Sequence, residues 1–157
     1  MKTPYLLPHR FKTPGWIILL VAAIAGIAVM NGWEPDWLNC RVFAWVTDRS
    51  FTEAGFFTWT NDNIANELAG IGYVAGGLLV GFSREKTEDE YIGAMRLKAL
   101  LWATLINYIL VIVALLFIYG LPFLTVMVFN MFTTLTLFVL WFNVMLFRYY
   151  KSAGHEK

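Results

Sequence analysis

Long apolar stretches alternate with short polar segments along this chain, and this pattern predicts its main elements. Four apolar stretches cover about residues 16–33, 63–83, 97–119 and 121–147. Each approaches or exceeds the roughly 20 residues that an α-helix needs to cross about 30 Å of hydrocarbon. Because a backbone surrounded by lipid must satisfy its own hydrogen bonds, the pattern predicts four membrane-spanning helices.

The first stretch also has features of a secretory signal, because basic residues precede a short apolar run. Trp16 and Trp33 bracket the run, however, at about the spacing of two interfacial anchors. We therefore predict a retained membrane span.

Composition agrees with a membrane protein. The chain is 59% hydrophobic and 15% charged, and its mean hydropathy is +0.59. A water-soluble domain of this size would have to expose much of that apolar surface to solvent. The net charge of +1 gives no basic face for nucleic acid. We therefore expect membrane lipid, and no nucleic acid, among the partners.

Basic residues are distributed unevenly between the polar segments. Ten of the 12 lie before the first stretch, between the second and third or at the start of the third, or after the fourth: Lys2, Arg10, Lys12, Arg84, Lys86, Arg96, Lys98, Arg148, Lys151 and Lys157. The other two, Arg41 and Arg49, lie in segment 34–62 beside six acidic residues. Since cytoplasmic segments carry the excess of Lys and Arg, both termini and a loop at 84–96 are predicted to be cytoplasmic.

Segment 34–62 is predicted to lie outside and to touch the bilayer, because aromatic residues are interleaved with its charges. Apolar positions at approximate helical spacing favour a short amphipathic helix at the outer headgroup level: Trp37, Cys40, Val42, Phe43, Trp45 and Val46. A lid or ligand-binding cap is the alternative. The predicted fold is all-α, a single domain (1–157) formed by an antiparallel four-helix transmembrane bundle with this interfacial segment between helices one and two.

Glycines recur in the second stretch at intervals of four, Gly72 to Gly76 and Gly77 to Gly81. Small residues at this spacing let a second helix approach closely in lipid. We interpret them as packing positions against the first span, where Ala22 and Gly26 have the same spacing. The alternative is a homodimer or partner interface.

Amides are the main polar groups predicted inside the spans, at Asn107, Asn130 and Asn143. No acidic or basic residue lies near mid-membrane, which argues against ion or proton coupling. The amides are interpreted as hydrogen-bonding groups between helices. The alternative is a cavity between the third and fourth spans for a small polar ligand or lipid headgroup.

The third helix is predicted to begin in the cytoplasm near Glu88, because Thr87 and Glu90 have the spacing of a capping box. Its first turns would present a candidate surface for docking a cytoplasmic partner: Glu88, Tyr91, Ile92, Met95 and Arg96. The ordinary alternative is a solvated run of charges.

Catalytic and metal-binding patterns are absent from the sequence. Cys40 is the only cysteine, and no His-Glu-x-x-His, paired-Cys, Gly-x-Ser-x-Gly or phosphate-loop motif occurs. The acidic residues at 85–90 alternate with basic ones and lack a calcium-loop pattern. We therefore predict no enzymatic activity, no catalytic residue, no cofactor and no metal site.

Two stretches resemble the small uncharacterised four-span bacterial membrane proteins. One is Phe82–Ile92, followed by Arg96, Leu97, Leu100, Asn107 and Tyr108; the other is Met127–Thr133. The resemblance covers about half of the chain and brings no catalytic motif. Genes of that family often lie beside one for a short helix-turn-helix regulator, which implies a signalling role in the bacterial cytoplasmic membrane.

The expected function is therefore a non-enzymatic sensor or regulatory partner that docks a cytoplasmic protein through residues 84–98. One alternative is an accessory subunit of a larger membrane complex, which would cover the glycine face of the second span. The other is a small-solute transporter with a path lined by Asn107, Asn130 and Thr133.

Overall fold

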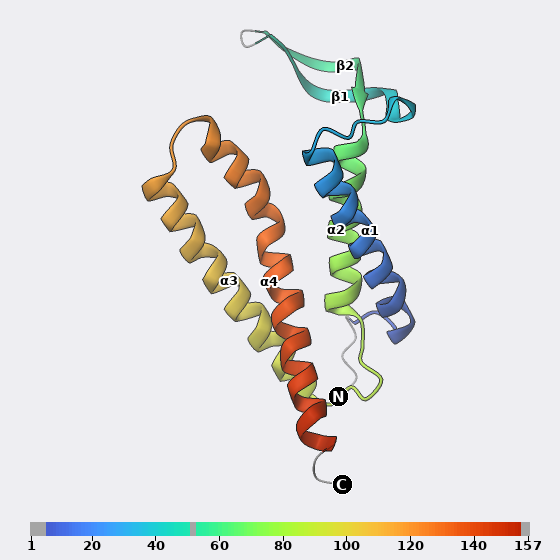
Figure 1. Ribbon diagram of the computed structural model, residues 1–157, viewed down its shortest axis with the longest axis vertical. Helices are drawn as coiled ribbons and strands as arrows, with labels where there is room; N and C mark the ends of the chain where they lie inside the picture. Colours follow the sequence, from blue (N-terminus) through green and yellow to red (C-terminus); the bar gives the residue numbers. More distant parts are fainter. Residues whose placement is uncertain (1–5, 51–52, 155–157) are drawn as a thin grey trace.

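Four long helices dominate the computed structural model, which describes residues 6–50 and 53–154 (Figure 1). They are α1 (Lys12–Met30), α2 (Ala65–Phe82), α3 (Glu90–Phe117) and α4 (Leu121–Gly154). Short 3-10 turns precede and follow α1, at η1 (His9–Phe11) and η2 (Asp36–Leu38). All four are long and apolar enough to cross a membrane, which confirms that the four predicted apolar stretches are helices.

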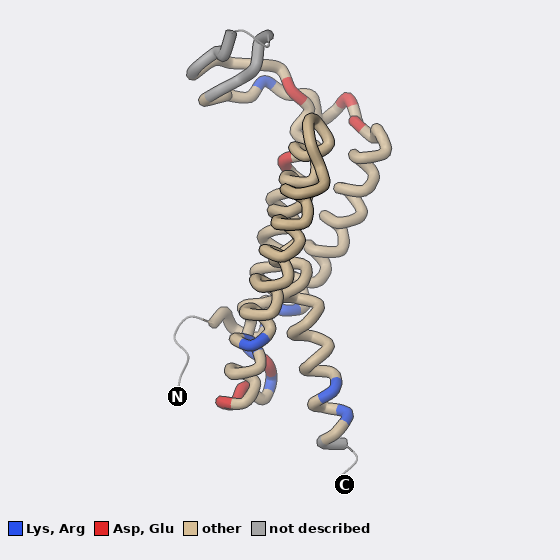
Figure 2. Tube along the Cα trace, turned by 90° about the vertical axis from the view of Figure 1, so that its left-hand side faces the viewer, with Lys and Arg blue, Asp and Glu red and all other residues tan. Residues whose placement is uncertain are grey.

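The helices form two antiparallel pairs. α1 packs along α2, α3 packs along α4, and contacts between α2 and α4 join the pairs. The pairs are close together where α1 starts and α4 ends, and they diverge toward the opposite end (Figure 1). We call the first the charged end, because most Lys and Arg lie there (Figure 2), and the second the hairpin end. The fold is thus two joined helical hairpins.

The hydrophobic core lies toward the charged end. Its buried members come from all four helices: Leu19, Val80, Ile92, Met95, Ala99, Ala103, Phe138, Val139, Phe142 and Leu146. In contrast, no side chain of α4 between Leu121 and Leu137 is buried. The protein therefore buries little of α4 near the hairpin end.

Segment 34–62 corrects the predicted fold, because it contains an antiparallel β-hairpin in place of an amphipathic helix. β1 (Asn39–Ser50) pairs with β2 (Glu53–Asn63), with Asn39 opposite Asn63 and Phe43 opposite Trp59. The hairpin projects sideways beyond the ends of α1 and α2 (Figure 1). The all-α class is therefore wrong in this segment, although the protein is mostly helical.

The aromatic positions alternate with the period of a strand, and this explains the hairpin. Phe43 and Trp45 are two residues apart in β1, and Phe57 and Trp59 are two apart in β2. Rings two apart on a strand share one face. Phe43 contacts Trp59 at 5.3 Å between ring centroids and Phe57 at 6.4 Å, and Trp45 contacts Phe57 at 6.2 Å. All four rings remain exposed.

Asn63 fixes the base of the hairpin to the start of α2. Its Nδ2 donates to Asn39 Oδ1 at 2.8 Å and to the Pro35 carbonyl at 3.0 Å, while its Oδ1 accepts from Ala65 N at 3.1 Å. One side chain thus links η2, both strands and the first turn of α2.

Helix boundaries differ from the predicted spans at several points. α1 ends at Met30, because Gly32 takes a positive φ of 85° and the Trp33 N–H bonds to the Ala28 carbonyl, as in a Schellman motif. A second positive φ, at Gly120, follows the end of α3 at Phe117. Pro122 lies in the first turn of α4, as predicted, but α4 continues to Gly154, beyond the predicted 147.

Candidate functional site at the charged end

The loop between α2 and α3 is tied to the segment before α1 through the backbone. Leu7 N donates to the Phe82 carbonyl at 3.0 Å, and Arg84 N donates to the Leu7 carbonyl at 2.9 Å. These bonds form a parallel bridge between Leu7 and Ser83. The first residues after α2 therefore have a fixed backbone.

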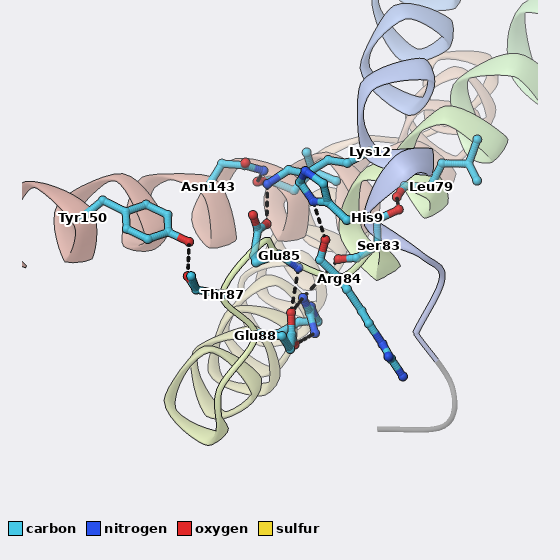
Figure 3. Close-up of polar contacts among 12 residues, drawn as sticks. His9, Lys12, Leu79, Ser83, Arg84, Glu85, Thr87, Glu88, Asn143 and Tyr150 are labelled. Carbon is cyan, nitrogen blue, oxygen red and sulfur yellow. Dashed lines mark hydrogen bonds and ion pairs between the residues drawn. The ribbon is translucent and has the colours of Figure 1, made fainter. Parts of the chain in front are cut away.

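Side chains from the start of α1 hold the same loop (Figure 3). His9 Nδ1 lies 2.8 Å from the Arg84 carbonyl oxygen, and because a carbonyl can only accept, the ring donates from Nδ1. Lys12 forms an ion pair with Glu85, whose side chain is only 6% exposed. Both contacts join positions more than 70 residues apart in the sequence.

Glu88 and Arg96 form the second ion pair of the site. Arg96 donates from Nη1 to Glu88 Oε1 at 2.7 Å and from Nη2 to Oε2 at 3.2 Å, and Nη2 also reaches the Ser83 carbonyl at 3.2 Å. The guanidinium lies 4.9 Å from the centre of the Phe142 ring. Arg96 thus connects α3 with the loop and with α4.

The pKa of Glu88 reflects this arrangement. Burial by itself raises the pKa of the carboxyl group, but opposing effects are together larger. Hydrogen bonds from Arg96 and from the Glu85 N–H, with the charges of Arg96 and Arg84, lower the pKa below its ordinary value of 4.5. Glu88 is therefore ionised at neutral pH.

The start of α3 corrects the predicted cap. Asp89 is the N-cap residue, and its Oδ1 accepts from Ile92 N at 2.7 Å. Thr87, predicted as the cap, instead lies 3.3 Å from the Tyr150 hydroxyl of α4. Glu88, at the predicted helix start, instead lies before this cap, and its side chain bonds to Arg96 and to the Glu85 N–H.

The predicted docking residues do not form one exposed surface. Ile92 is fully buried, Met95 and Arg96 are 7% and 8% exposed, and Glu88 is half-buried. Only Tyr91 is clearly exposed. This corrects the prediction, because the apolar face at 92 and 95 packs into the core. The exposed residues between 86 and 91, which we call the outward ridge, are Lys86, Thr87, Asp89, Glu90 and Tyr91.

The first glycine pair of α2 faces α1. A methyl group added at Gly76 would lie 2.5 Å from Leu19 N and 2.8 Å from Leu19 Cα, and one added at Gly72 would lie 3.1 Å from Ala22 Cβ. Gly26 does not take part as expected, since an added methyl there would meet nothing within 4 Å. The backbones of α1 and α2 are therefore closest where Gly76 faces Leu19.

The second glycine pair faces α4. A methyl group added at Gly77 would lie 2.5 Å from Leu135 Cδ2, and one added at Gly81 would collide with the Phe138 ring. One glycine pair of α2 thus contacts α1, and the other contacts α4. These two helices cover the surface that a homodimer or a partner subunit was predicted to use.

The intramembrane amides divide into a pair and a single residue. Asn130 Nδ2 donates to Asn107 Oδ1 at 3.0 Å, and Asn107 Nδ2 donates back to Asn130 Oδ1 at 3.4 Å. Asn143 instead donates to the Val139 carbonyl of its own helix at 2.7 Å, and Thr133 bonds to the Phe129 carbonyl at 3.0 Å. These groups are satisfied by the protein itself.

Replacing Asn107 by Leu is expected to lower the free energy of unfolding by about 1 kcal/mol, because Asn130 loses its partner between two helices. Denaturation in detergent micelles measures the change. A variant with Leu at both positions is expected to be more stable than the single variant, since no amide is left unpaired. A single variant as stable as the original protein would contradict this assignment.

Within the described residues, no group of three or more His, Cys, Asp or Glu side chains is arranged to hold a metal ion. Cys40 is free and exposed on β1. The roles of His9, Lys12, Ser83 and Glu85 could not be predicted, because these residues make contacts with distant segments. Glu88 and Arg96 were both predicted as site residues, because they lie close together in the sequence within region 84–98.

No family model, curated protein or solved structure matches this chain.

Proposed function

We propose that this chain is a non-enzymatic membrane protein that acts as a sensor or regulatory partner and docks a cytoplasmic protein through the outward ridge in region 84–98. The proposal is supported by the side-chain contacts that fix the loop beneath the ridge. His9 holds the loop from η1, Lys12 from α1 and Arg96 from α3. A surface fixed in this way loses little conformational entropy when a partner binds.

The distribution of charge supports an orientation with both termini in the cytoplasm of a bacterium. The charged end carries Lys and Arg from α1, the loop, α3 and α4 (Figure 2), and the positive-inside rule assigns such an end to the cytoplasm. The β-hairpin would then lie on the outer side. Its exposed rings suit the sensing side, because aromatic side chains are favoured at the boundary between lipid and water.

A photo-cross-linking residue at Lys86 tests the docking surface. In native membranes we expect it to cross-link to a separate protein, whereas the same residue at Leu105 of α3, 52% exposed on an apolar helix, is expected to cross-link to lipid. Substituting Arg96→Gln is expected to reduce the yield from Lys86, because the loop loses its support. Orientation is established in the same membranes by labelling Cys40 with an impermeant thiol reagent.

Two results would contradict the proposal. Cross-links from Lys86 only to lipid or to copies of this chain would exclude a cytoplasmic partner, and labelling of Cys40 only from the cytoplasmic side would reverse the orientation.

The two alternatives receive less support. The accessory-subunit hypothesis relied on glycines that already contact α1 and α4. The transporter hypothesis relied on amides that already bond to each other.

A further inference from the structure

A groove between α3 and α4 opens at the charged end, on a surface separate from the outward ridge except at Tyr91. Its volume is about 430 Å³, and it is lined by Tyr91, Ala94, Met95, Lys98, Met145, Arg148, Tyr149 and Ser152. We propose that this groove binds the headgroup of an anionic phospholipid. The inference goes beyond the proposed function and does not depend on it.

The charges of the groove are of one sign. Lys98 and Arg148 both line it, and no acidic residue does. Within the described part of the chain, Lys12 and Arg96 are paired with Glu85 and Glu88, whereas neither Lys98 nor Arg148 forms an ion pair. Both side chains are exposed. An ammonium and a guanidinium offer eight N–H donors between them, and a phosphate group accepts such donors strongly.

The depth of the groove matches the headgroup level of a bilayer. Trp102 and Trp141 stack at 6.5 Å between ring centroids, and Lys98 lies one turn, about 6 Å, closer to the charged end. Tyr91 and Tyr149 contact each other at 5.2 Å in the wall of the groove. Trp and Tyr mark the interface between hydrocarbon and water. A ligand at this depth is therefore a component of the membrane itself.

The lining also suits a lipid better than a soluble anion. Met145 and Ala94 add apolar surface beside the cations, whereas Met95 is only 7% exposed and contributes little. The hydroxyl groups of Tyr91, Tyr149 and Ser152 supply further donors. A phospholipid can place its phosphate on Lys98 and Arg148 while its glycerol and first methylene groups contact the apolar part, whereas a free phosphate would use only the cations.

Native mass spectrometry of the full chain, with phosphatidylglycerol or phosphatidylcholine added, tests the proposal. We expect the original protein to retain phosphatidylglycerol in preference to phosphatidylcholine. Replacing both cations, Lys98→Gln with Arg148→Gln, is expected to weaken retention on the order of 20-fold. The matched control, Lys86→Gln with Lys151→Gln, removes the same charge from exposed positions outside the groove and is expected to change retention less than about 2-fold.

Several outcomes would overturn the proposal. Equal retention of the two lipids by the original protein would do so without any variant, and so would an equal loss in the control. Displacement of phosphatidylglycerol by millimolar inorganic phosphate would assign the groove to a soluble anion. The variant Lys98→Arg with Arg148→Lys keeps both charges and is expected to retain the lipid; its failure to do so while folded would also count against the site.

Discussion

Replacing Gly76 by Ala is expected to lower the thermal unfolding midpoint in detergent by roughly 5–10 °C. The added methyl group would lie 2.5 Å from Leu19 N and 2.8 Å from Leu19 Cα, and a backbone cannot move aside as a flexible side chain can. α1 would have to separate from α2 along their contact. Such overpacking costs about 2–3 kcal/mol, and we expect the loss to appear directly in a thermal scan.

Gly26→Ala is the matched control, because it is the same substitution in the neighbouring helix. A methyl group at Gly26 would meet nothing within 4 Å, and Ala is the better helix former. The midpoint is therefore expected to stay the same or to rise slightly. Equal decreases in the two variants would contradict the close-approach explanation, because Gly→Ala raises helix propensity at both positions.

Substituting Arg96→Gln is expected to lower the free energy of unfolding by about 2–3 kcal/mol. The change leaves Glu88 without its partner and removes the contacts to the Ser83 carbonyl and the Phe142 ring. We expect less than the full cost of breaking a deeply buried pair, because the Glu88 side chain is 17% exposed. Arg10→Gln is the control, since Arg10 is exposed in η1.

A double-mutant cycle with Glu88→Gln and a pH series separate the pair from general packing. The double variant is expected to lose less than the sum of the single variants. The pKa of Glu88 is lowered in the folded state, so its ion pair stabilises the protein fully above about pH 4.5 and less as pH falls through the lowered pKa. Glu88→Gln should therefore flatten this part of the acid profile; an unchanged profile would contradict the pairing.

The helices were predictable because lipid restricts the backbone so strongly. A stretch such as 97–119 has few alternatives to a helix, and the observed α3 includes most of it. Boundaries were less predictable, because they depend on single residues. The positive φ of Gly32 ends α1 before Trp33, and the Asp89 cap starts α3 at Glu90.

The β-hairpin was missed because its segment is not restricted in the same way. Trp37, Phe43 and Trp45 fit a loose helical spacing, although Phe43 and Trp45 also fit a strand. The sequence near residues 48–54 has no Asn-Gly or Asp-Gly dipeptide to mark a hairpin. The pairing depends instead on contacts between the strands, such as Phe43 with Trp59.

The site at the charged end was predicted only in part, for a related reason. Region 84–98 was identified from local charge and helix-capping signals. The orientation of each residue was set by distant partners, since Lys12 and His9 come from the start of the chain and Phe142 from α4. Burial of Ile92 and Met95 follows from the same convergence.

The divergence of the two helical pairs has a mechanical consequence. α2 holds α4 at positions such as Leu135 and Phe138, and α4 continues from Phe132 to Leu121, about 16 Å, with no buried side chain. Tilting α4 by about 10° around Phe132 would displace its far end by about 3 Å, while the ion pairs below would scarcely move. In a bilayer, lateral force on the hairpin end would therefore act on α4 as a lever whose fulcrum is its contact with the glycines of α2.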